Sequence, residues 1–243
     1  MNLLLYDAPM KIELKGHDIY VNEVLHQKNI RYLSAMSEVF KEIIDIDALG
    51  NLEMYYMFRR VYTTNGICYD ITLLPPLTID EECNKTYGHY HQQAENGMSY
   101  PEIYHVLEGN AVFILQKKNR DASINAHVIK ATKGEVIFIP PNYGHVTVNP
   151  SKEILLLSNT VADGPESDYS EYKKERGAAI YYTVDGNILQ NNNYVIKEIE
   201  RTNVKKFNKK FNFVCDDLLV QFYNNPEKFE FLKKPSLLLK NSK

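Results

Sequence analysis

A succession of short β-forming runs is the feature of this sequence that most constrains its fold. From Glu53 to Val161 the chain is rich in Val, Ile, Tyr and Phe, and clusters of Asn, Gly, Pro and Lys divide it. The runs are LEMYYMFRRVY, ICYDITLLPP, YHVLEGNAVFILQK, NAHVIKAT, EVIFIP and EILLLSNTV. Many short strands between such turn signals are typical of an all-β sandwich or barrel. Gly109-Asn110, inside the third run, predicts a tight turn between two strands.

The segment before these runs has a different pattern. Residues 1–30 alternate short apolar runs with polar residues, which predicts irregular structure or edge strands, with His17 and His26 on the surface. From Asn29 to Ile46 the apolar residues recur at spacings typical of a helix, namely at Leu33, Met36, Val39, Phe40, Ile43 and Ile44. This spacing predicts an amphipathic helix. We therefore expect residues 1–50 to form an N-terminal segment with one helix packed on the barrel.

The C-terminal part is basic. After Asn159 we expect a loop, a short helix from Ser167 to Arg176 and a strand from Ala179 to Val184, which would end a barrel spanning residues 51–184. Residues 185–243 then form a basic extension of the same structural unit. Its lysines are solvated, and we expect its interleaved phenylalanines to dock on the barrel or on a partner subunit. They are Phe207, Phe211, Phe213, Phe222, Phe229 and Phe231.

Charge and composition exclude several classes of protein. The formal net charge of -3 argues against a nucleic-acid-binding protein. The chain has three cysteines and no CxxC pair, which predicts free thiols in a reducing compartment. Neither a signal peptide nor a membrane-spanning segment is evident, because no apolar run is long enough. A cytoplasmic protein is the expectation.

Three histidines and one glutamate are candidates for a metal site. Side chains of His89 and His91, two positions apart, project from one face of a strand. Glu102 begins an apolar run after a loop of Gly, Asn, Ser and Pro, so a second strand can turn back beside the first. His145 follows the turn sequence PPNYG. Three imidazole nitrogens and one carboxylate, with positions left open, suit zinc or a catalytic first-row metal.

Two other histidines fall among the predicted strands. His105 has the opposite parity to Glu102 on the same strand, so its side chain should face away from the metal. His127 lies in a segment without a partner signature, and we assign it no role.

The spacing of these residues resembles the two signature motifs of the cupin superfamily. The first consists of His-x-His, a later Glu and a Gly seven residues after that Glu, and the second is Gly-x5-Pro followed by His-x3-Asn. The resemblance implies a double-stranded β-helix, the cupin or jelly-roll barrel. The gap from His91 to Glu102 is longer than is usual in cupins, which implies an inserted loop.

Further motifs resemble one branch of the cupins, the metal-dependent glucose-6-phosphate isomerases of archaea and some bacteria. They are IRYLSAM, ITLLPP, TYGHYH, PEIYHVLEG, PPNYGHVTVN and SDY, and they run from about Asn29 to Val184. The resemblance implies interconversion of glucose 6-phosphate and fructose 6-phosphate in glycolysis or gluconeogenesis. It also implies a homodimer that binds a small-molecule sugar phosphate, and neither nucleic acid nor a membrane.

The same resemblance assigns roles to individual residues. The metal ligands are His89, His91, Glu102 and His145, and they would hold one divalent ion per subunit, with Fe(II) expected first and Mn(II), Zn(II) or Ni(II) as alternatives. The substrate phosphate would be bound by Thr72, Thr86 and Gly88. Tyr55 and Tyr104 match tyrosines that line the sugar pocket. Glu102 is the candidate proton shuttle between C1 and C2, while the metal acts as a Lewis acid.

The sequence departs from the family pattern at two positions. The pattern has a Tyr and a His where this chain has Val161 and Ser167, neither of which can perform acid–base chemistry. Glu166, Asp163 or Tyr169 would have to replace them, or the substrate or the activity has changed. An isomerase or epimerase of another sugar phosphate, a non-catalytic sugar-phosphate-binding cupin and a metal oxygenase are therefore alternatives.

Overall fold

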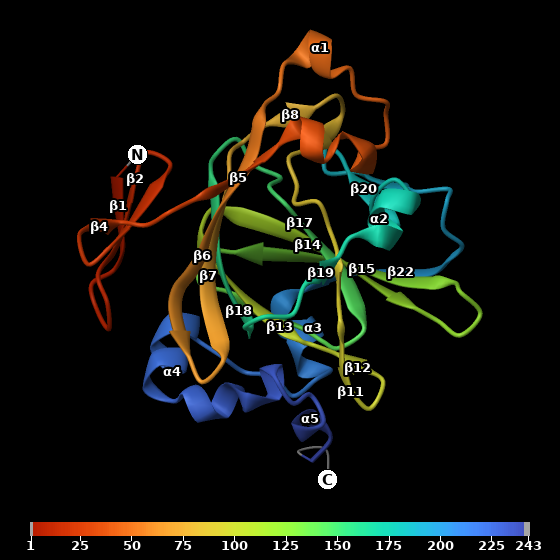
Figure 1. The fold of residues 1–243 in the computed structure, drawn as a ribbon. Coiled ribbons are helices and arrows are strands. Elements are labelled where there is room, and N and C mark those ends of the chain that lie inside the picture. The colour runs from red at the N-terminus through yellow and green to blue at the C-terminus, as the bar shows by residue number, and fades with distance from the viewer. Residues whose placement is uncertain (1, 241–243) are drawn as a thin grey trace.

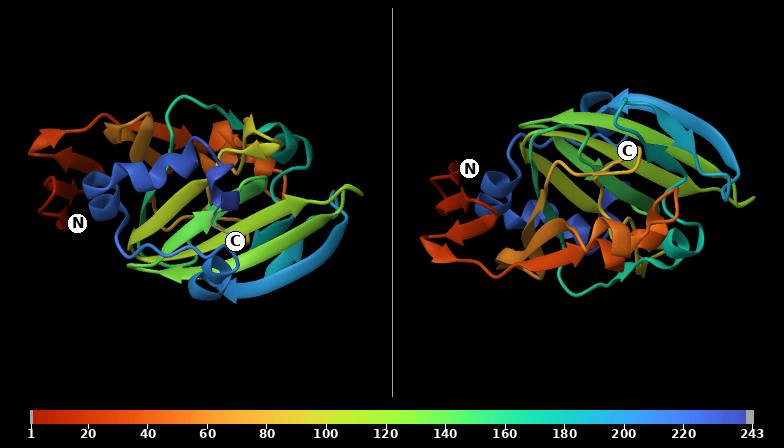
Figure 2. Two further views of the ribbon diagram at one scale, coloured as in Figure 1. Left: turned by 90° about the horizontal axis from the view of Figure 1, so that it is seen from below. Right: turned by 90° about the horizontal axis from the view of Figure 1, so that it is seen from above.

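Two facing β-sheets form the body of the molecule (Figures 1 and 2). A computed structural model describes residues 2–240. The six-stranded sheet contains, in spatial order, β16 (Val136–Ile139), β13 (Glu102–Glu108), β18 (Leu155–Ala162), β7 (Ile67–Leu74), β6 (Glu53–Thr64) and β5 (Asn29–Tyr32). The four-stranded sheet contains β17 (Tyr143–Val148), β14 (Asn110–Lys118), β15 (Ile124–Thr132) and β22 (Ile196–Asn203). The predicted all-β jelly-roll architecture is confirmed.

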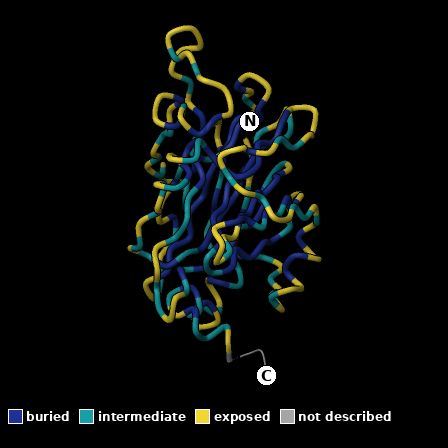
Figure 3. The backbone as a smooth tube through the Cα atoms, turned by 90° about the vertical axis from the view of Figure 1, so that its right-hand side faces the viewer, coloured by how far each residue is buried: buried dark blue, intermediate teal, exposed yellow. Residues whose placement is uncertain are grey.

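The six-stranded sheet is covered on both faces. All eight residues of β7 are buried, as expected for a strand with no face in water. One set of its side chains, including Leu74, joins the core between the two sheets with Phe113. The alternate set, including Ile71, packs on the other face against Leu219 and Phe222 of the C-terminal part. Figure 3 shows the resulting buried centre, with the exposed residues in the peripheral loops.

The chain passes from one sheet to the other at Gly109. β13 pairs with β16 and β18, whereas β14 pairs with β15 and β17. The prediction that a tight turn at Gly109-Asn110 joins two strands is correct in position, although the two strands do not pair with each other. Each strand finds partners far away in the sequence, because both must bury an apolar face in the common core.

Four short strands precede the barrel and form a separate meander beside it (Figure 1). They are β1 (Asn2–Tyr6), β2 (Ile12–Lys15), β3 (Asp18–Val21) and β4 (Val24–Leu25). This agrees with the predicted strands in residues 1–30. His17 is exposed and His26 half-buried.

The predicted helix from Asn29 to Ile46 is wrong. The segment begins with strand β5 and continues with two 3-10 turns, η1 (Leu33–Ala35) and η2 (Ser37–Val39). The short helix α1 (Ile46–Leu49) follows. Residues of β5 pair with β6, so Ile30 lies opposite Tyr56 and the backbone is extended. The helical spacing reflects burial of Leu33 and Met36 in 3-10 turns, and Ile43 is exposed. Sheet pairing outweighed the local helical pattern.

Smaller elements complete the chain. The short strand pairs are β8 (Thr78–Ile79) with β9 (Glu82–Cys83), β10 (Tyr90–His91) with β19 (Ser167–Asp168), β11 (Gln93–Glu95) with β12 (Met98–Ser99), and β20 (Ile180–Tyr182) with β21 (Ile188–Gln190). Helix α2 (Ser170–Lys174) is shorter than the predicted helix, because Ser167 and Asp168 pair with β10.

The basic C-terminal segment packs on the barrel. It contains α3 (Val204–Lys209), α4 (Leu218–Asn224), the 3-10 helix η3 (Pro226–Leu232) and α5 (Leu237–Lys240). Phe207, Phe222 and Phe229 are buried, so docking of the phenylalanines on the barrel is confirmed. The predicted extension also supplies a sheet strand, since β22 pairs in parallel with β15. Within residues 2–240, no helix is both long and apolar enough to cross a membrane.

Candidate metal centre

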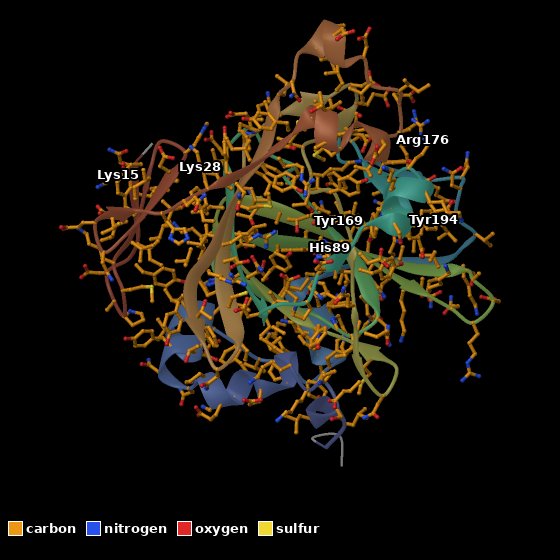
Figure 4. The ribbon with its side chains drawn as sticks, in the orientation of Figure 1. Lys15, Lys28, His89, Tyr169, Arg176 and Tyr194 are labelled. Carbon is orange, nitrogen blue, oxygen red and sulfur yellow. The ribbon has the colours of Figure 1, made fainter. Side chains whose placement is uncertain are left out.

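The structure brings the four candidate ligands to one point between the two sheets. Glu102 is the first residue of β13 in the six-stranded sheet, and His145 lies on β17 in the four-stranded sheet. His89 precedes β10 and shares two backbone hydrogen bonds with His145, and His91 ends β10. One ligand atom from each of the four residues lies within 4.8 Å of the others. Figure 4 shows His89 in the interior of the barrel.

One part of the predicted strand arrangement is wrong. The strand with Glu102 was expected to turn back beside that with His91, but β10 pairs with β19, whereas β13 pairs with β16 and β18. The hairpin of β11 and β12 lies in the long gap between His91 and Glu102, where an inserted loop was predicted. The ligands meet because the barrel closes around them.

The donor atoms face a common centre. Glu102 Oε2 lies 3.3 Å from His91 Nε2 and 3.1 Å from His145 Nε2. His89 Nε2 lies 3.1 Å from His91 Nε2. Glu102 Oε2 is buried and receives no hydrogen bond from the described residues. Three imidazole nitrogens and a carboxylate oxygen converging in this way fit a divalent transition metal or zinc.

Surrounding groups fix the orientation of the ligands. His91 Nδ1 lies 2.7 Å from the carbonyl oxygen of Tyr100, which can only accept, so Nδ1 carries a proton and, in the neutral ring, Nε2 has the free lone pair. Asn159 Nδ2 donates to Glu102 Oε1 at 2.7 Å and leaves Oε2 for a metal. Contacts of this kind hold the rings and carboxylates of metal sites in place.

The charges of the site suit a cation. Burial opposes ionisation of Glu102, but the adjacent His145 and His91 outweigh this effect and hold its pKa well below the usual range. Burial, together with the nearby His145 and His91, lowers the pKa of His89 well below its usual value. A charged carboxylate and a neutral imidazole are the forms that bind metal ions.

A pocket opens over these ligands. Its wall includes all five predicted substrate-binding residues, namely Tyr55, Thr72, Thr86, Gly88 and Tyr104. Tyr104 also places its hydroxyl 3.3 Å from His145 Nε2. His105, in contrast, faces the opposite side of β13 and contacts the Tyr6 hydroxyl at 3.4 Å, as its parity predicted.

Several lining residues were not predicted from the sequence, namely Met57, Arg59, Tyr87, Tyr100, Asn159 and Pro165. Met57 and Arg59 continue the alternation that begins at Tyr55 on β6, so strand parity was the signal that could have identified them. Tyr87 and Tyr169 stand over the guanidinium of Arg31, with the ring of Tyr55 on a third side. His127, which received no role, pairs with Glu200 at 3.0 Å and is not among the residues that line the pocket.

A sequence model described as "Glucose-6-phosphate isomerase (GPI)" matches residues 28–197. The chain belongs to this family. Two members of known name are the glucose-6-phosphate isomerases of Thermococcus onnurineus and Thermococcus litoralis. The first is 29% identical over 57% of this chain and 68% of its own length. The second is 24% identical over 69% of this chain and 86% of its own length.

Among solved structures, an oxalate oxidase in complex with the substrate analogue glycolate is similar to this chain. It has 14% sequence identity and a TM-score of 0.38, and the match covers 48% of this chain and 55% of the oxidase. Membership of the glucose-6-phosphate isomerase family therefore follows from the sequence match. The barrel architecture follows from the strand pairing described above.

The two departures from the glucose-6-phosphate isomerase pattern both line the pocket. Val161 lies opposite Glu102 across the β13–β18 ladder, and Ser167 lies opposite His91 across the β10–β19 pair. Of the suggested replacements, Tyr169 lines the pocket and its ring centroid is 5.6 Å from that of His89 (Figure 4). Asp163 instead accepts a hydrogen bond from Arg60 at 2.9 Å.

Proposed function

We propose that this protein is a metal-dependent isomerase that interconverts glucose 6-phosphate and fructose 6-phosphate, a step of glycolysis and gluconeogenesis. The observation that carries the proposal is the convergence of three histidines and Glu102 at the base of a pocket. Membership of the glucose-6-phosphate isomerase family supports the choice of substrate.

The metal would be held by His89, His91, Glu102 and His145. We propose one divalent ion per subunit, Fe(II) first, with Mn(II), Zn(II) and Ni(II) as alternatives, because nitrogen and carboxylate ligands accept all four. When bound, such an ion polarises the carbonyl and the adjacent hydroxyl of the open-chain sugar. The burial of Glu102 and His145 keeps bulk water from these ligands.

Glu102 is the group proposed to move the proton. Isomerisation removes a proton from C2 of the aldose and returns one to C1, and a carboxylate beside both carbons serves as base and then as acid. The low pKa of Glu102 keeps it ionised before the reaction begins. Asn159 prevents rotation of the carboxylate by donating to Oε1.

The part of the pocket wall formed by Thr72, Thr86 and Gly88 is proposed to bind the phosphate. Thr86 Oγ1 already accepts a hydrogen bond from the backbone N–H of Thr147 at 3.0 Å, so its hydroxyl hydrogen can point to a ligand. Thr72 and the backbone amide of Gly88 are further donors in the same wall. Tyr55 and Tyr104 supply hydroxyls that can bond to sugar oxygens.

A coupled assay with fructose 6-phosphate tests this function. Metal-stripped protein should be inactive, and stepwise addition of Fe(II), Mn(II), Zn(II) and Ni(II) should identify the active metal. Glu102→Gln should lower kcat by about 10²- to 10⁴-fold, the usual contribution of a positioned base. Glu108→Gln is the matched control, since Glu108 is on the same strand but pairs with the exposed Lys133. Full activity after chelation contradicts the proposal.

A second candidate is favoured by Val161 and Ser167. Because these two side chains cannot exchange protons, the pocket also suits a non-catalytic sugar-phosphate-binding protein, or an isomerase or epimerase of a different sugar phosphate. Calorimetric binding and turnover measured over a panel of hexose and pentose phosphates separate these possibilities. Binding without turnover of any member favours the non-catalytic protein.

We further propose that the chain acts as a homodimer and binds neither nucleic acid nor membranes. The net charge of -3 supports the second part. Sedimentation velocity tests the first, and a monomer at micromolar concentration contradicts it.

A further inference from the structure

A guanidinium group that the family resemblance assigns no role stands in the wall of the pocket. Arg59 alternates with Tyr55 and Met57 along β6, so all three share the face that lines the pocket. Among the described lining residues, Arg59 is the one lysine or arginine. The other proposed phosphate contacts, Thr72, Thr86 and Gly88, are neutral donors.

Asp70 holds this guanidinium in place. Its Oδ2 accepts a hydrogen bond from Arg59 Nη1 at 2.9 Å, and its Oδ1 accepts one from the backbone N–H of Arg60 at 2.6 Å. The Asp70 residue is 2% exposed, whereas the Arg59 side chain is half exposed. A buried carboxylate with both oxygens occupied thus anchors one edge of a guanidinium whose other edge is accessible.

Strand register places Arg59 and Thr72 in one wall of the pocket. Arg59 Nη2 lies 3.3 Å from Met57 Sδ, and Met57 is the residue directly opposite Thr72 in the β6–β7 pair. Asp70 precedes Thr72 by two positions on β7 and therefore lies on the same face. The guanidinium and the threonine already proposed as a phosphate contact thus belong to the same wall of the pocket.

Arg59 has N–H groups that Asp70 does not occupy. A guanidinium carries five N–H groups in a planar fork. One of them donates to Asp70, and the contact of another with the thioether sulfur of Met57 is weak because that sulfur is a poor acceptor. The fork matches two oxygens of a phosphate, which a lysine ammonium does not. Among the described lining residues, neutral hydroxyl and amide donors alone would offer the dianion no counter-charge apart from the metal. The Arg31 guanidinium is packed among the rings of Tyr55, Tyr87 and Tyr169 and does not itself line the pocket.

We propose that Arg59, anchored by Asp70, is the charged phosphate contact of this pocket and binds the substrate phosphate together with Thr72. This inference depends on the proposed function only in taking a sugar phosphate as the ligand. It implies that the pocket selects phosphorylated over unphosphorylated sugars chiefly through Arg59.

Binding to metal-stripped protein tests the inference without requiring turnover. Fructose 6-phosphate and unphosphorylated fructose are titrated by calorimetry into wild type, Arg59→Gln, Arg59→Lys and the control Arg60→Gln. Arg60 is the adjacent arginine, and its side chain pairs with Asp163 at 2.8 Å on the exposed side. Circular dichroism and thermal melts verify that each variant is folded.

Arg59→Gln should weaken binding of fructose 6-phosphate by about 10- to 100-fold, the size of a charge-assisted contact to phosphate. Arg59→Lys should recover only part of the loss, and Arg60→Gln should bind as wild type does. In the metal-loaded enzyme, Arg59→Gln should raise KM by the same factor and leave kcat within about threefold of the wild-type value. This is the pattern expected when an interaction is equally strong in the ground state and in the transition state.

Two results overturn the inference: unchanged binding of fructose 6-phosphate to folded Arg59→Gln, or a loss confined to kcat. Wild-type protein that does not bind the sugar phosphate overturns it as well. A third outcome separates the two proposals: wild type binds fructose 6-phosphate, Arg59→Gln does not, and no added metal gives turnover. This result supports the Arg59 site and contradicts the isomerase function.

Discussion

The metal ligands depend on a small set of neighbouring side chains. Asn159 donates to Glu102 Oε1, and the Tyr100 carbonyl fixes the ring of His91. The ligands themselves were predictable, because His-x-His, Glu and His have a recognisable spacing. Asn159 and Tyr100 were not, since they reach the site only through the β13–β18 ladder and the β11–β12 hairpin. Which neighbour orients a ligand depends on the fold as a whole.

Asn159→Ala should weaken metal binding by about 10- to 100-fold, as loss of an orienting contact does in other metal sites. The physical reason is that the Glu102 carboxylate then rotates freely and loses its preset direction. Titration of metal-stripped protein with Mn(II) or Zn(II) against a chelating indicator measures the dissociation constant. Asn192→Ala, in an exposed turn, is the control. Equal affinities for wild type and Asn159→Ala would contradict the role of Asn159.

At the scale of strands, the sequence predicted which faces are buried better than which strands pair. His105 faces away from Glu102 because alternation along a strand is a local property. The pairing expected between the strands of His91 and Glu102 and the helix expected from Asn29 were wrong, because pairing is decided by contacts across the whole chain. The turns around Met36 bury Leu33, Met36, Val39 and Phe40 of the predicted helix face, whereas Ile43 of that face is exposed.

The turn before the first histidine ligand offers a test of close packing. Gly88 has a φ of +86°, and a Cβ added there would lie 2.4 Å from Val146 Cγ2 and 2.5 Å from Tyr172 Cε1. Gly88→Ala should therefore lower the free energy of unfolding by about 2–5 kcal/mol, from backbone strain plus overpacking. Gly97 has a φ of +70° with no atom within 4 Å of an added Cβ.

Gly97→Ala thus isolates the backbone part, with an expected loss of about 1 kcal/mol. Urea unfolding of the metal-stripped proteins measures both values. A Gly88→Ala variant no less stable than Gly97→Ala would show that the contacts with Val146 and Tyr172 relax without cost.

For the whole molecule, one polar contact joins three separate parts. The Tyr6 hydroxyl, from the N-terminal meander, lies 3.4 Å from His105 Nδ1 of the barrel and donates to Asp217 at 3.3 Å. Asp217 in turn caps helix α4 by accepting from the backbone N–H of Val220. The contact between the meander, the barrel and the C-terminal helices could not be predicted from sequence, since nothing local in Tyr6 or Asp217 indicates a partner so distant.

This contact should make stability depend on pH. Burial lowers the pKa of His105, and the nearby Asp217 only partly offsets this effect. In the unfolded chain the pKa of a histidine is about 6.5, so His105 binds a proton more readily there than in the folded protein. Stability is therefore lost as pH falls below that value. His105→Gln should flatten the decline in unfolding free energy between about pH 6.5 and 5. Chemical denaturation at several pH values measures it, and parallel curves for both proteins would refute the assignment.

The parallel pairing of β15 with β22 has a consequence for synthesis of the chain. β22 covers the edge of β15 in the four-stranded sheet, yet it is the last of the barrel strands in the sequence. At synthesis rates of about 5–20 residues per second, β15 leaves the ribosome several seconds before its partner exists. During that time its unpaired edge is open to other chains. The final strand therefore covers this edge only when synthesis of the barrel is complete, and premature termination before Ile196 would leave the edge permanently exposed.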